Sequence, residues 1–463
     1  MKSSITQDKN GLNIIIVGCG KVGSTLVKQL SHEGHDITII DKNPAKIQSI
    51  IDLYDIMGLV GNGASYSVQM EAGIENADLI IAVTDSDELN LLCCTVAKRV
   101  GNCAAIARVR TPDYSNEVNY LREKLELAMI INPELEAANE VARILYLPTA
   151  LEVNTFAHGQ AEIIKFRIPE DNILDGVSIS ELGKKINLSF LICAVEREGK
   201  VFIPSGDFIL QKNDYVSFVA SRNNARAFLK KIGFKTNQAK NTMIIGGGKV
   251  AYYLAKQLLN IGMSVKIIEC NKERCEELSV LLPQAVIING DGTDEELLKE
   301  EGIAYTESFV ALTGIDEENI MLTLHAKQAS NAKVITKINR ITFKNVINNL
   351  DLGSVIYPSF VTSEAIIAYV RAKNNSTNSN VETLYHMFDS QVEAIEFNVT
   401  ENSDVTDIPL MELPLKKNLL ICFINRNGKI FLPSGHDCIK SGDNVMIVTT
   451  HGGFTDIRDI LKK

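Results

Sequence analysis

The sequence contains no tryptophan, no CxxC pair and no apolar run near the roughly 18–20 residues that a helix needs to cross a bilayer. Its 463 residues carry a formal net charge of −10, so it lacks the basic face with which proteins bind nucleic acid or anionic lipid. Segment 1–10 is polar and lacks the apolar core of a signal peptide. We therefore expect a protein that does not enter a membrane and that serves one only by binding another protein.

Motifs for metal binding and catalysis are also missing. The nine cysteines are scattered and mostly lie in apolar runs, which favours reduced, buried thiols in a cytosolic protein over disulfides or zinc ligands. The seven histidines form no constellation that recurs along the chain, and there is no Walker A motif for ATP hydrolysis. No acid–base pair of the kind that a dehydrogenase needs can be identified. The sequence therefore predicts no catalytic residue and no metal ligand.

The sequence does contain one unit that is repeated. Segment 13–30, NIIIVGCGKVGSTLVKQL, returns as NTMIIGGGKVAYYLAKQL at 241–258, with ten of 18 positions identical at an offset of 228. Segment 191–206, LICAVEREGKVFIPSG, returns as LICFINRNGKIFLPSG at 420–435. Two distant segments that keep the same register indicate duplication of a whole unit.

Each unit is expected to have two parts. In the first part, short strands that are apolar throughout alternate with helices, which is typical of a doubly wound, Rossmann-like parallel sheet covered on both faces. In the second part, the segments 162–168 and 216–220 indicate strands, and 196–200 indicates a hairpin turn, so a small α+β module is expected. The fold class is therefore α/β, in two tandem units. The expected domains are 12–148, 149–234, 241–373 and 381–463, joined by polar linkers at 235–240 and 374–380.

The first strand of each unit leads into a glycine-rich loop. Gly18, Gly20 and Gly23 form a GxGxxG motif between a strand and a helix, which is the context that the dinucleotide-binding fingerprint requires. The first glycine allows the tight turn, the second lets the backbone approach a pyrophosphate, and the third allows close helix packing. The free N–H groups of the helix start would then bind the phosphates.

Polar residues follow the next strands of the first unit. Asp41 ends the second strand, 23 residues after Gly18, where a carboxylate can accept ribose hydroxyls and repel a 2′-phosphate, which favours NAD over NADP. Asn62, Thr84, Asp85 and Arg108 follow or end strands three to five, at the sheet edge where ligands bind. Alternatively, Asp41 caps the helix that starts near Pro44, and Asn62 and Asp85 cap the helices after them.

The second copy keeps this pattern with changes. Its loop, from Gly246 to Ala251, has alanine at the third position, and Glu269 replaces the aspartate at the same spacing. The positions that correspond to those after strands three to five are Asp291, Thr313, Gly314 and Lys337. Because glutamate reaches further than aspartate and lysine lacks the arginine fork, we expect a second nucleotide site with different affinity or ligand preference. Two nucleotide sites without a catalytic pair suggest that the nucleotide is a signal.

These segments together resemble the RCK (KTN) domain family, the regulators of potassium conductance. The resemblance rests on the first glycine loop with Asp41, on VGNGAS (60–65), EAGIENADLIIAVTDSDELN (71–90) and ARVR (107–110), on INGDGTDEELLKEEG (288–302) and ALTGIDEEN (311–319), and on GKVFIPSG (199–206) with GKIFLPSG (428–435). Two such units in tandem, without a membrane span, are the layout of the peripheral subunit of Trk-type potassium uptake systems.

The resemblance implies a regulatory, NAD(H)-binding protein on the cytoplasmic face of the inner membrane, docked on an integral membrane potassium transporter subunit of the TrkH/TrkG type. It also implies a homo-oligomer, a tetramer in this case, and no enzymatic activity. The implied first nucleotide site consists of Gly18, Cys19, Gly20, Lys21, Val22, Asp41, Asn62, Thr84, Asp85 and Arg108. The implied second site consists of Gly246, Gly247, Gly248, Lys249, Val250, Glu269, Asp291, Thr313, Gly314 and Lys337.

Two other functions stay open at this point. One is an ATP- or ADP-sensing RCK regulator of another cation transporter, and the other is an NAD-dependent dehydrogenase with a duplicated fold. The helices expected at 133–145 and 358–372 leave the two sheets at matching positions. We expect them to be the crossover elements through which the two units pair, although they could simply pack the duplicated core.

Overall fold

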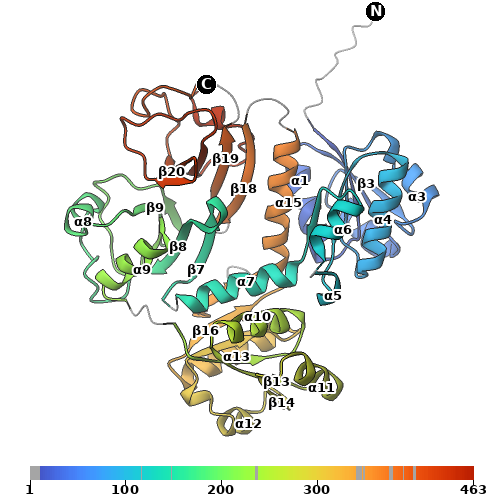
Figure 1. Ribbon diagram of the computed structural model, residues 1–463, viewed down its shortest axis with the longest axis horizontal. Helices are drawn as coiled ribbons and strands as arrows, with labels where there is room; N and C mark the ends of the chain where they lie inside the picture. Colours follow the sequence, from blue (N-terminus) through green and yellow to red (C-terminus); the bar gives the residue numbers. More distant parts are fainter. Residues whose placement is uncertain are drawn as a thin grey trace, which may run out of the picture. The chain divides into compact units, whose positions relative to one another are not determined.

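The computed structural model describes residues 11–462 apart from 116, 148, 235–237, 340–346, 348–349, 375–378, 389 and 400–402. The chain divides into two compact units (Figure 1). The first unit contains residues 1–136 and 359–370, and the second contains 137–358 and 371–463. Within the two expected linkers, residues 235–237 and 375–378 lie outside the described residues.

The first unit contains a parallel sheet with the strand order β3-β2-β1-β4-β5-β6. This is the order of a doubly wound Rossmann sheet, in which the chain reverses direction beside β1. Its strands are β1 (Asn13–Val17), β2 (Asp36–Asp41), β3 (Met57–Val60), β4 (Leu79–Ala82), β5 (Ala104–Arg108) and β6 (Met129–Ile131). Its helices are α1 (Lys21–His32), α2 (Pro44–Ile51), α3 (Tyr66–Glu71), η1 (Ile74–Asn76), α4 (Asp87–Val100), α5 (Pro112–Ser115) and α6 (Val118–Lys124).

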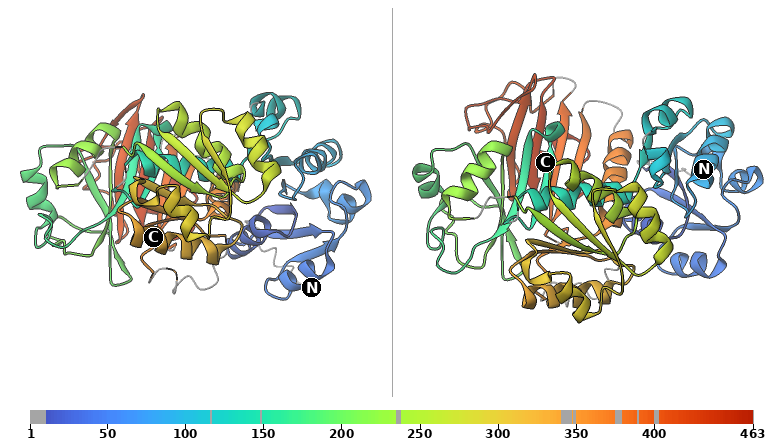
Figure 2. Two further views of the ribbon diagram at one scale, coloured as in Figure 1. Left: turned by 90° about the horizontal axis from the view of Figure 1, so that it is seen from below. Right: turned by 60° about the horizontal axis from the view of Figure 1, so that its bottom comes forward.

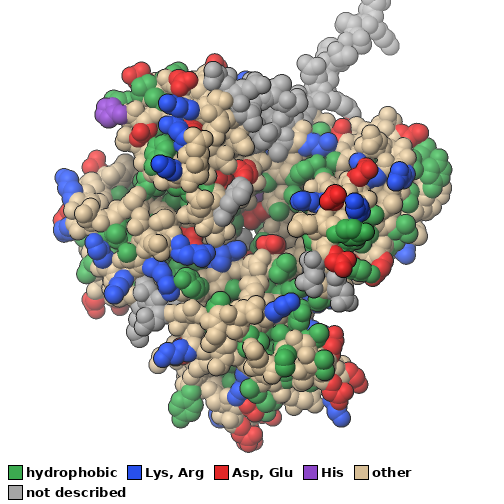
Figure 3. All heavy atoms as spheres, viewed as in Figure 1, with side chains coloured by type: hydrophobic (Ala, Val, Ile, Leu, Met, Phe, Trp, Pro, Cys, Tyr) green, Lys and Arg blue, Asp and Glu red, His purple; other side chains and the backbone are tan. Residues whose placement is uncertain are grey.

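The second unit contains a parallel sheet of the same order, β14-β13-β12-β15-β16-β17. Its strands are β12 (Asn241–Ile245), β13 (Ser264–Glu269), β14 (Val286–Asn289), β15 (Ser308–Ala311), β16 (Lys333–Lys337) and β17 (Ser354–Ile356). Its helices are α10 (Lys249–Asn260), α11 (Lys272–Leu281), α12 (Glu295–Glu300), η3 (Ile303–Tyr305) and α13 (Asp316–Ala329), which lie on both faces of the sheet (Figure 2). Acidic side chains gather over α11 and α12 (Figure 3).

Each parallel sheet is followed along the chain by a five-stranded antiparallel sheet. The first small sheet module contains β7 (Glu152–Phe156), η2 (Ala157–Gly159), β8 (Ala161–Arg167), α8 (Ile179–Lys185), β9 (Leu191–Arg197), β10 (Lys200–Phe202), β11 (Tyr215–Ser221) and α9 (Arg222–Lys231). The second contains β18 (Ser379–Met387), β19 (Val392–Val399), β20 (Leu419–Arg426), β21 (Lys429–Phe431), β22 (Asn444–Thr449) and η4 (Ile457–Ile460). The expected hairpin joins β9 to β10, with Glu198 and Gly199 at positive φ of 51° and 77°.

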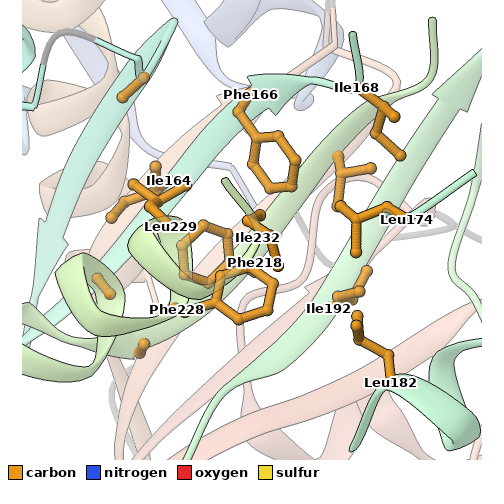
Figure 4. Packing of buried hydrophobic residues seen from close by; sticks show 14 of the residues in the cluster. Ile164, Phe166, Ile168, Leu174, Leu182, Ile192, Phe218, Phe228, Leu229 and Ile232 are labelled. Atoms are coloured by element: carbon orange, nitrogen blue, oxygen red, sulfur yellow. The ribbon is translucent and has the colours of Figure 1, made fainter. Parts of the chain in front are cut away.

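The core of the first small sheet module is aromatic and aliphatic (Figure 4). Phe166 on β8, Phe218 on β11 and Phe228 on α9 pack edge-on or tilted against one another, with ring centroids 4.7–6.4 Å apart. All three are fully buried, so α9 covers one face of the sheet. The other face of the sheet contributes to a second cluster, which it shares with the second small sheet module.

Two long helices connect the parallel sheets to the small modules, α7 (Pro133–Tyr146) and α15 (Pro358–Asn374). From Ala137 onward, α7 belongs to the second unit, where Asn139 accepts a hydrogen bond from Gln257 of α10 at 2.7 Å (Figure 1). Conversely, residues 359–370 of α15 belong to the first unit. Each helix therefore groups with the parallel sheet of the other copy, as expected for crossover elements.

Candidate nucleotide-binding site

The glycines of the first loop are required by close backbone approaches. Gly18 has φ of +107°, and a Cβ there would lie 3.0 Å from backbone atoms of Val83 and Thr84. A Cβ at Gly23 would lie 1.9 Å from the carbonyl oxygen of Gly18, so only glycine lets α1 start this close to β1. In the second copy Gly246 has the same conformation, with φ of +96°.

The start of α1 is open to a ligand. Gly20 is its N-cap, no described side chain caps it, and its first turn contains no acidic residue. A Cβ on Gly20 would meet no heavy atom of the described chain within 4 Å. Gly248 at the start of α10 has the same properties. Lys21 with Val22, and Lys249 with Val250, form the first helical residues behind these glycines. Neither helix start is closed by a side-chain cap from the described residues, so both can bind an anion through their backbone N–H groups.

The acidic residue at the end of the second strand holds the glycine loop. In the first copy, the Asp41 carboxylate accepts hydrogen bonds from the N–H groups of Cys19, at 2.7 Å, and Asn43, at 2.8 Å. The N-cap of α2 is Asn43, whose side chain accepts from the N–H groups of Ala45 and Lys46. Asp41 is therefore not the cap of this helix, and its carboxylate faces the loop.

Glu269 has the matching role in the second copy. It accepts hydrogen bonds from the N–H groups of Gly247, at 2.6 Å, and Asn271, at 2.7 Å. Although burial acts to raise it, the pKa of Glu269 is lowered by these N–H groups, by Cys270 and by the positive charge of Arg274. Arg274 also donates from Nε to the carbonyl oxygen of Gly247, at 2.7 Å. The second loop is therefore fixed by an arginine in addition to the carboxylate.

A cavity of about 380 Å³ lies between the first glycine loop and the carboxyl ends of the strands. Gly18, Gly20, Asp41, Thr84 and Asp85 are the predicted residues that line it. Its other lining residues were not predicted as site residues and are Val17, Ile40, Lys42, Lys46, Gly61, Gly63, Val83, Ser86 and Leu89. This volume lies within the range of small-molecule sites. Two of these residues, Gly61 and Gly63, flank Asn62, and the GNG sequence that they form could have indicated them.

Arg108 lies at the end of β5 but does not line this cavity. Its side chain is about 10% exposed, and Nη2 donates to the carbonyl oxygen of Thr84 and to the carboxylate of Asp85, the latter at 3.3 Å. Burial and the nearby charge of Arg110 lower the pKa of Arg108. Its buried Nε has no hydrogen-bond partner among the described residues. The guanidinium therefore fixes the loop after β4, and its Nε–H group remains available to donate a hydrogen bond.

The remaining predicted residues lie in turns at the same edges. Asn62 and Asp291 are exposed, and each accepts from the backbone two residues onward, Ala64 and Thr293 respectively. The N–H and hydroxyl of Thr293 lower the pKa of Asp291. The caps of α3 and α4 are Ser65 and Ser86, so neither Asn62 nor Asp85 is a helix cap.

In the second copy the strand ends are joined in a similar way. Lys337 donates from Nζ to the carbonyl oxygen of Leu312, at 3.0 Å. The hydroxyl of Thr313 donates to the carbonyl oxygen of Ile315, at 3.1 Å. A Cβ at Gly314 would meet no described atom within 4 Å, so this loop has free space beside it.

Two further residues at these sites, Asn90 and Asn319, were not predicted. Asn90 on α4 is fully buried, and its amide oxygen accepts from the N–H and hydroxyl of Thr84, while its NH₂ donates to the carbonyl oxygens of Thr84 and Arg108. Asn319 on α13 makes the same backbone bonds to Thr313 and Lys337. Each asparagine thus ties two strand ends together at a site edge.

Within the part of the chain that the structure describes, no group of three or more His, Cys, Asp or Glu side chains is placed to hold a metal ion. No helix among the described residues is both long enough and apolar enough to span a bilayer.

Comparison with protein families matches this chain twice to each of two domain models. The TrkA-N domain matches residues 14–133 and 242–358, and the TrkA-C domain matches 163–233 and 394–462. These ranges follow the two parallel sheets and the two small sheet modules.

Similar curated proteins cover almost the whole chain. The Trk system potassium uptake protein TrkA of Haemophilus influenzae is 30% identical over 440 residues, which are 94% of this chain and 95% of the relative. A TrkA homolog of Archaeoglobus fulgidus is 31% identical over 451 residues, 97% of this chain and all of the relative. Among solved structures, the GsuK channel bound to NAD superposes with a TM-score of 0.63 at 17% identity, over 96% of this chain and 78% of that chain.

Proposed function

This chain belongs to the TrkA family, and we propose that it is a regulatory, NAD(H)-binding subunit that controls potassium flux through an integral membrane transporter subunit of the TrkH/TrkG type. The names of its relatives support potassium uptake, and the NAD-bound GsuK channel of similar fold supports the nucleotide. We further propose that the chain acts at the cytoplasmic face of the inner membrane as a homo-oligomer, a tetramer, with domains at 12–148, 149–234, 241–373 and 381–463.

The observation that carries the proposal is the duplicated arrangement of an open helix start, a glycine loop and a carboxylate. In the first copy, the N–H groups behind Gly20 would bind the pyrophosphate, and Asp41 would accept the ribose hydroxyls. Each oxygen of Asp41 already accepts one backbone N–H, but a carboxylate oxygen has a second lone pair for a hydroxyl. Lys42 and Lys46 line the cavity and add positive charge toward phosphate.

We propose the corresponding residues of the second copy as a second, weaker site. Arg274 there bonds to the carbonyl of Gly247, at the position that corresponds to Lys46 in the first copy. A nucleotide that approaches this loop has to compete with that bond and with the packing of the Leu278 side chain, which lies 2.6 Å from where a Cβ of Gly247 would be.

Regulation follows if the bound nucleotide favours one arrangement of the two units over another. A ligand shifts such an equilibrium only by the difference between its affinities for the two states. The crossover helices α7 and α15 begin at the ends of β6 and β17, so they connect the ligand-binding edges to the packing of the other copy.

Calorimetric titration of the purified chain with NAD, NADH, NADPH, ATP and ADP tests the ligand. We expect NAD(H) to bind more tightly than NADP(H), and Gly20→Glu to abolish binding at the first site by placing a carboxylate at the helix start. Tighter binding of ATP or ADP than of NAD(H) would support the nucleotide-sensing alternative instead. Steady NADH oxidation that copurifies with the chain and is lost in Gly20→Glu would support a dehydrogenase.

A further inference from the structure

The two small sheet modules pack against each other through matching positions. The cluster they share contains Ile163, Cys193, Ala194 and Val219 from the first module and, at the equivalent places of the second, Ala394, Cys422, Phe423 and Val448. Because both partners use the same patch, the interface has the character of a two-fold, isologous contact. In such a contact, a residue meets its own equivalent only where it lies on the axis.

Cys193 and Cys422 are such a pair. They occupy the same position in the repeated LIC sequence, on β9 and β20, and these two strands contact each other. Both side chains are fully buried in the cluster that the two modules share. The Cys193 thiol also donates to the carbonyl oxygen of Ser217, at 3.3 Å, and the Cys422 thiol to that of Leu420, at 3.7 Å.

We propose that Cys193 and Cys422 form a redox site, at which a low-molecular-weight disulfide oxidises the two thiols to one disulfide that ties the small sheet modules together. The duplication brings the two cysteines into one buried cluster although 228 residues separate them in sequence. A bond between them closes that long loop and removes much of the freedom of the unfolded chain.

The reaction proceeds by two thiol–disulfide exchanges. One cysteine loses its proton, and its thiolate attacks the small disulfide, releasing one small thiolate that takes up the proton. The other cysteine then loses its proton and attacks the mixed disulfide, releasing the second small thiolate, which is protonated in turn. Two protein thiols are oxidised by two electrons in total, and one small disulfide is reduced to two small thiols.

The burial of both sulfurs sets the conditions for this reaction. Burial and the neighbouring Cys193 thiol hold the pKa of Cys422 well above its usual range, so little thiolate exists while the interface is closed. The first exchange therefore needs the two modules to separate locally, whereas the second needs them to pair again. Formation of the bond thus reports opening and closing of this interface, and the finished bond fixes it closed.

The test uses the full chain, incubated with oxidised glutathione without denaturant and then quenched with an alkylating maleimide. We expect mass spectrometry of a non-reducing digest to find a peptide pair linked through Cys193 and Cys422, faster migration on a non-reducing gel, and a higher thermal midpoint. Dithiothreitol should reverse all three. The exposed Cys270 reports that the oxidant is active.

Three single variants provide the controls. Cys193→Ala and Cys422→Ala should each abolish the linked peptide and the gain in thermal midpoint. Cys94→Ala, which removes an equally buried thiol from the first unit, should leave both intact. The proposal is overturned if wild-type protein with Cys270 fully oxidised forms no 193–422 link, or forms it only after unfolding in guanidinium. Neither result requires the variants to fold.

Discussion

At the end of β2, the carboxylate of Asp41 has two separate tasks. It holds the glycine loop through the N–H of Cys19, and in the proposed site it also accepts ribose hydroxyls. An asparagine separates these tasks, because its amide oxygen still accepts from Cys19 while the negative charge is lost. The structural task should survive the substitution and the binding task should not.

We therefore expect Asp41→Asn to weaken NADH binding at the first site about tenfold, since a hydrogen bond to a charged group contributes about 1.5 kcal/mol or more. NADPH should lose less or gain, because its 2′-phosphate no longer faces a carboxylate. Calorimetry of both ligands checks this, with Glu269→Gln as the matched variant of the second site. Unchanged NADH affinity together with unchanged discrimination would mean that Asp41 only holds the loop.

Asn90 illustrates a residue that acts through others. Its buried amide satisfies backbone groups of Thr84 and Arg108, so a leucine of similar size leaves those groups without partners. Each unsatisfied buried group costs about 1–3 kcal/mol. We expect Asn90→Leu to lower the free energy of unfolding by at least about 2 kcal/mol and to weaken nucleotide binding at the first site more than at the second.

Chemical denaturation and calorimetry measure the two effects, and Asn319→Leu should show the reverse preference between sites. If Asn90→Leu loses stability while the first site keeps its full affinity, the asparagine serves the fold alone.

The sequence indicates Asp41 as a site residue through its spacing from Gly18 and its place after an apolar strand. It does not reveal Asn90, because one amide on the inner face of a helix follows no periodic pattern.

At the scale of elements, the strands and helices of the first sheet lie where the apolar runs predicted them. Within this sheet, β2 ends at Asp41, as predicted. The glycine loops and the helix starts at Pro133 and Pro358 could also be predicted from the sequence, because they depend on local backbone chemistry. The individual contacts of α7 and α15 depend on side chains of the other copy, as with Asn139 and Gln257, and no local pattern encodes them.

Lys333 makes another contact between residues of the two copies. It begins β16, and its Nζ donates to the carbonyl oxygen of Ala150, in the segment that follows α7. Burial, together with the positive charge of Lys327, lowers the pKa of Lys333 from 10.5 to about 7. The ammonium form is therefore disfavoured in the folded protein, whereas the unfolded chain stays protonated up to about pH 10.5.

Between about pH 7 and 10.5 the unfolded chain binds one more proton at this residue than the folded chain does. Stability therefore rises with pH in this window, by up to ~1.4 kcal/mol per pH unit, and this contribution is flat below pH 7. We expect Lys333→Met to remove this rise in the free energy of unfolding. Lys333→Arg stays charged, so its free energy of unfolding should fall further below that of the wild type as the pH increases. Urea unfolding at several pH values checks both, and identical pH profiles for wild type and Lys333→Met would contradict it.

At the scale of the whole molecule, duplication has produced two glycine loops whose surroundings are similar but not equal. The second residue of the loop is Cys19 in one copy and Gly247 in the other, and Arg108 corresponds to Lys337. Among the described contacts, an arginine donates to a carbonyl of the glycine loop only in the second copy, where Arg274 donates to Gly247. The two copies also exchange the helices α7 and α15, each of which begins in one copy and groups with the parallel sheet of the other.

If nucleotide binding controls a transporter partner, the coupling must act in both directions. A coupling of about 1–3 kcal/mol means that bound nucleotide changes the affinity for the partner roughly five- to 150-fold, and the partner then changes nucleotide affinity by the same factor. We expect the affinities for NADH and NAD to move by different factors when the chain is titrated with its membrane partner reconstituted in lipid. Asp41→Ala should reduce the change that belongs to the first site, and Glu269→Ala the change that belongs to the second. If transport still requires the chain while neither affinity moves on binding the partner, the nucleotide has no differential effect on the two states. The chain would then be a scaffold for the transporter, and its nucleotide sites would serve its own stability.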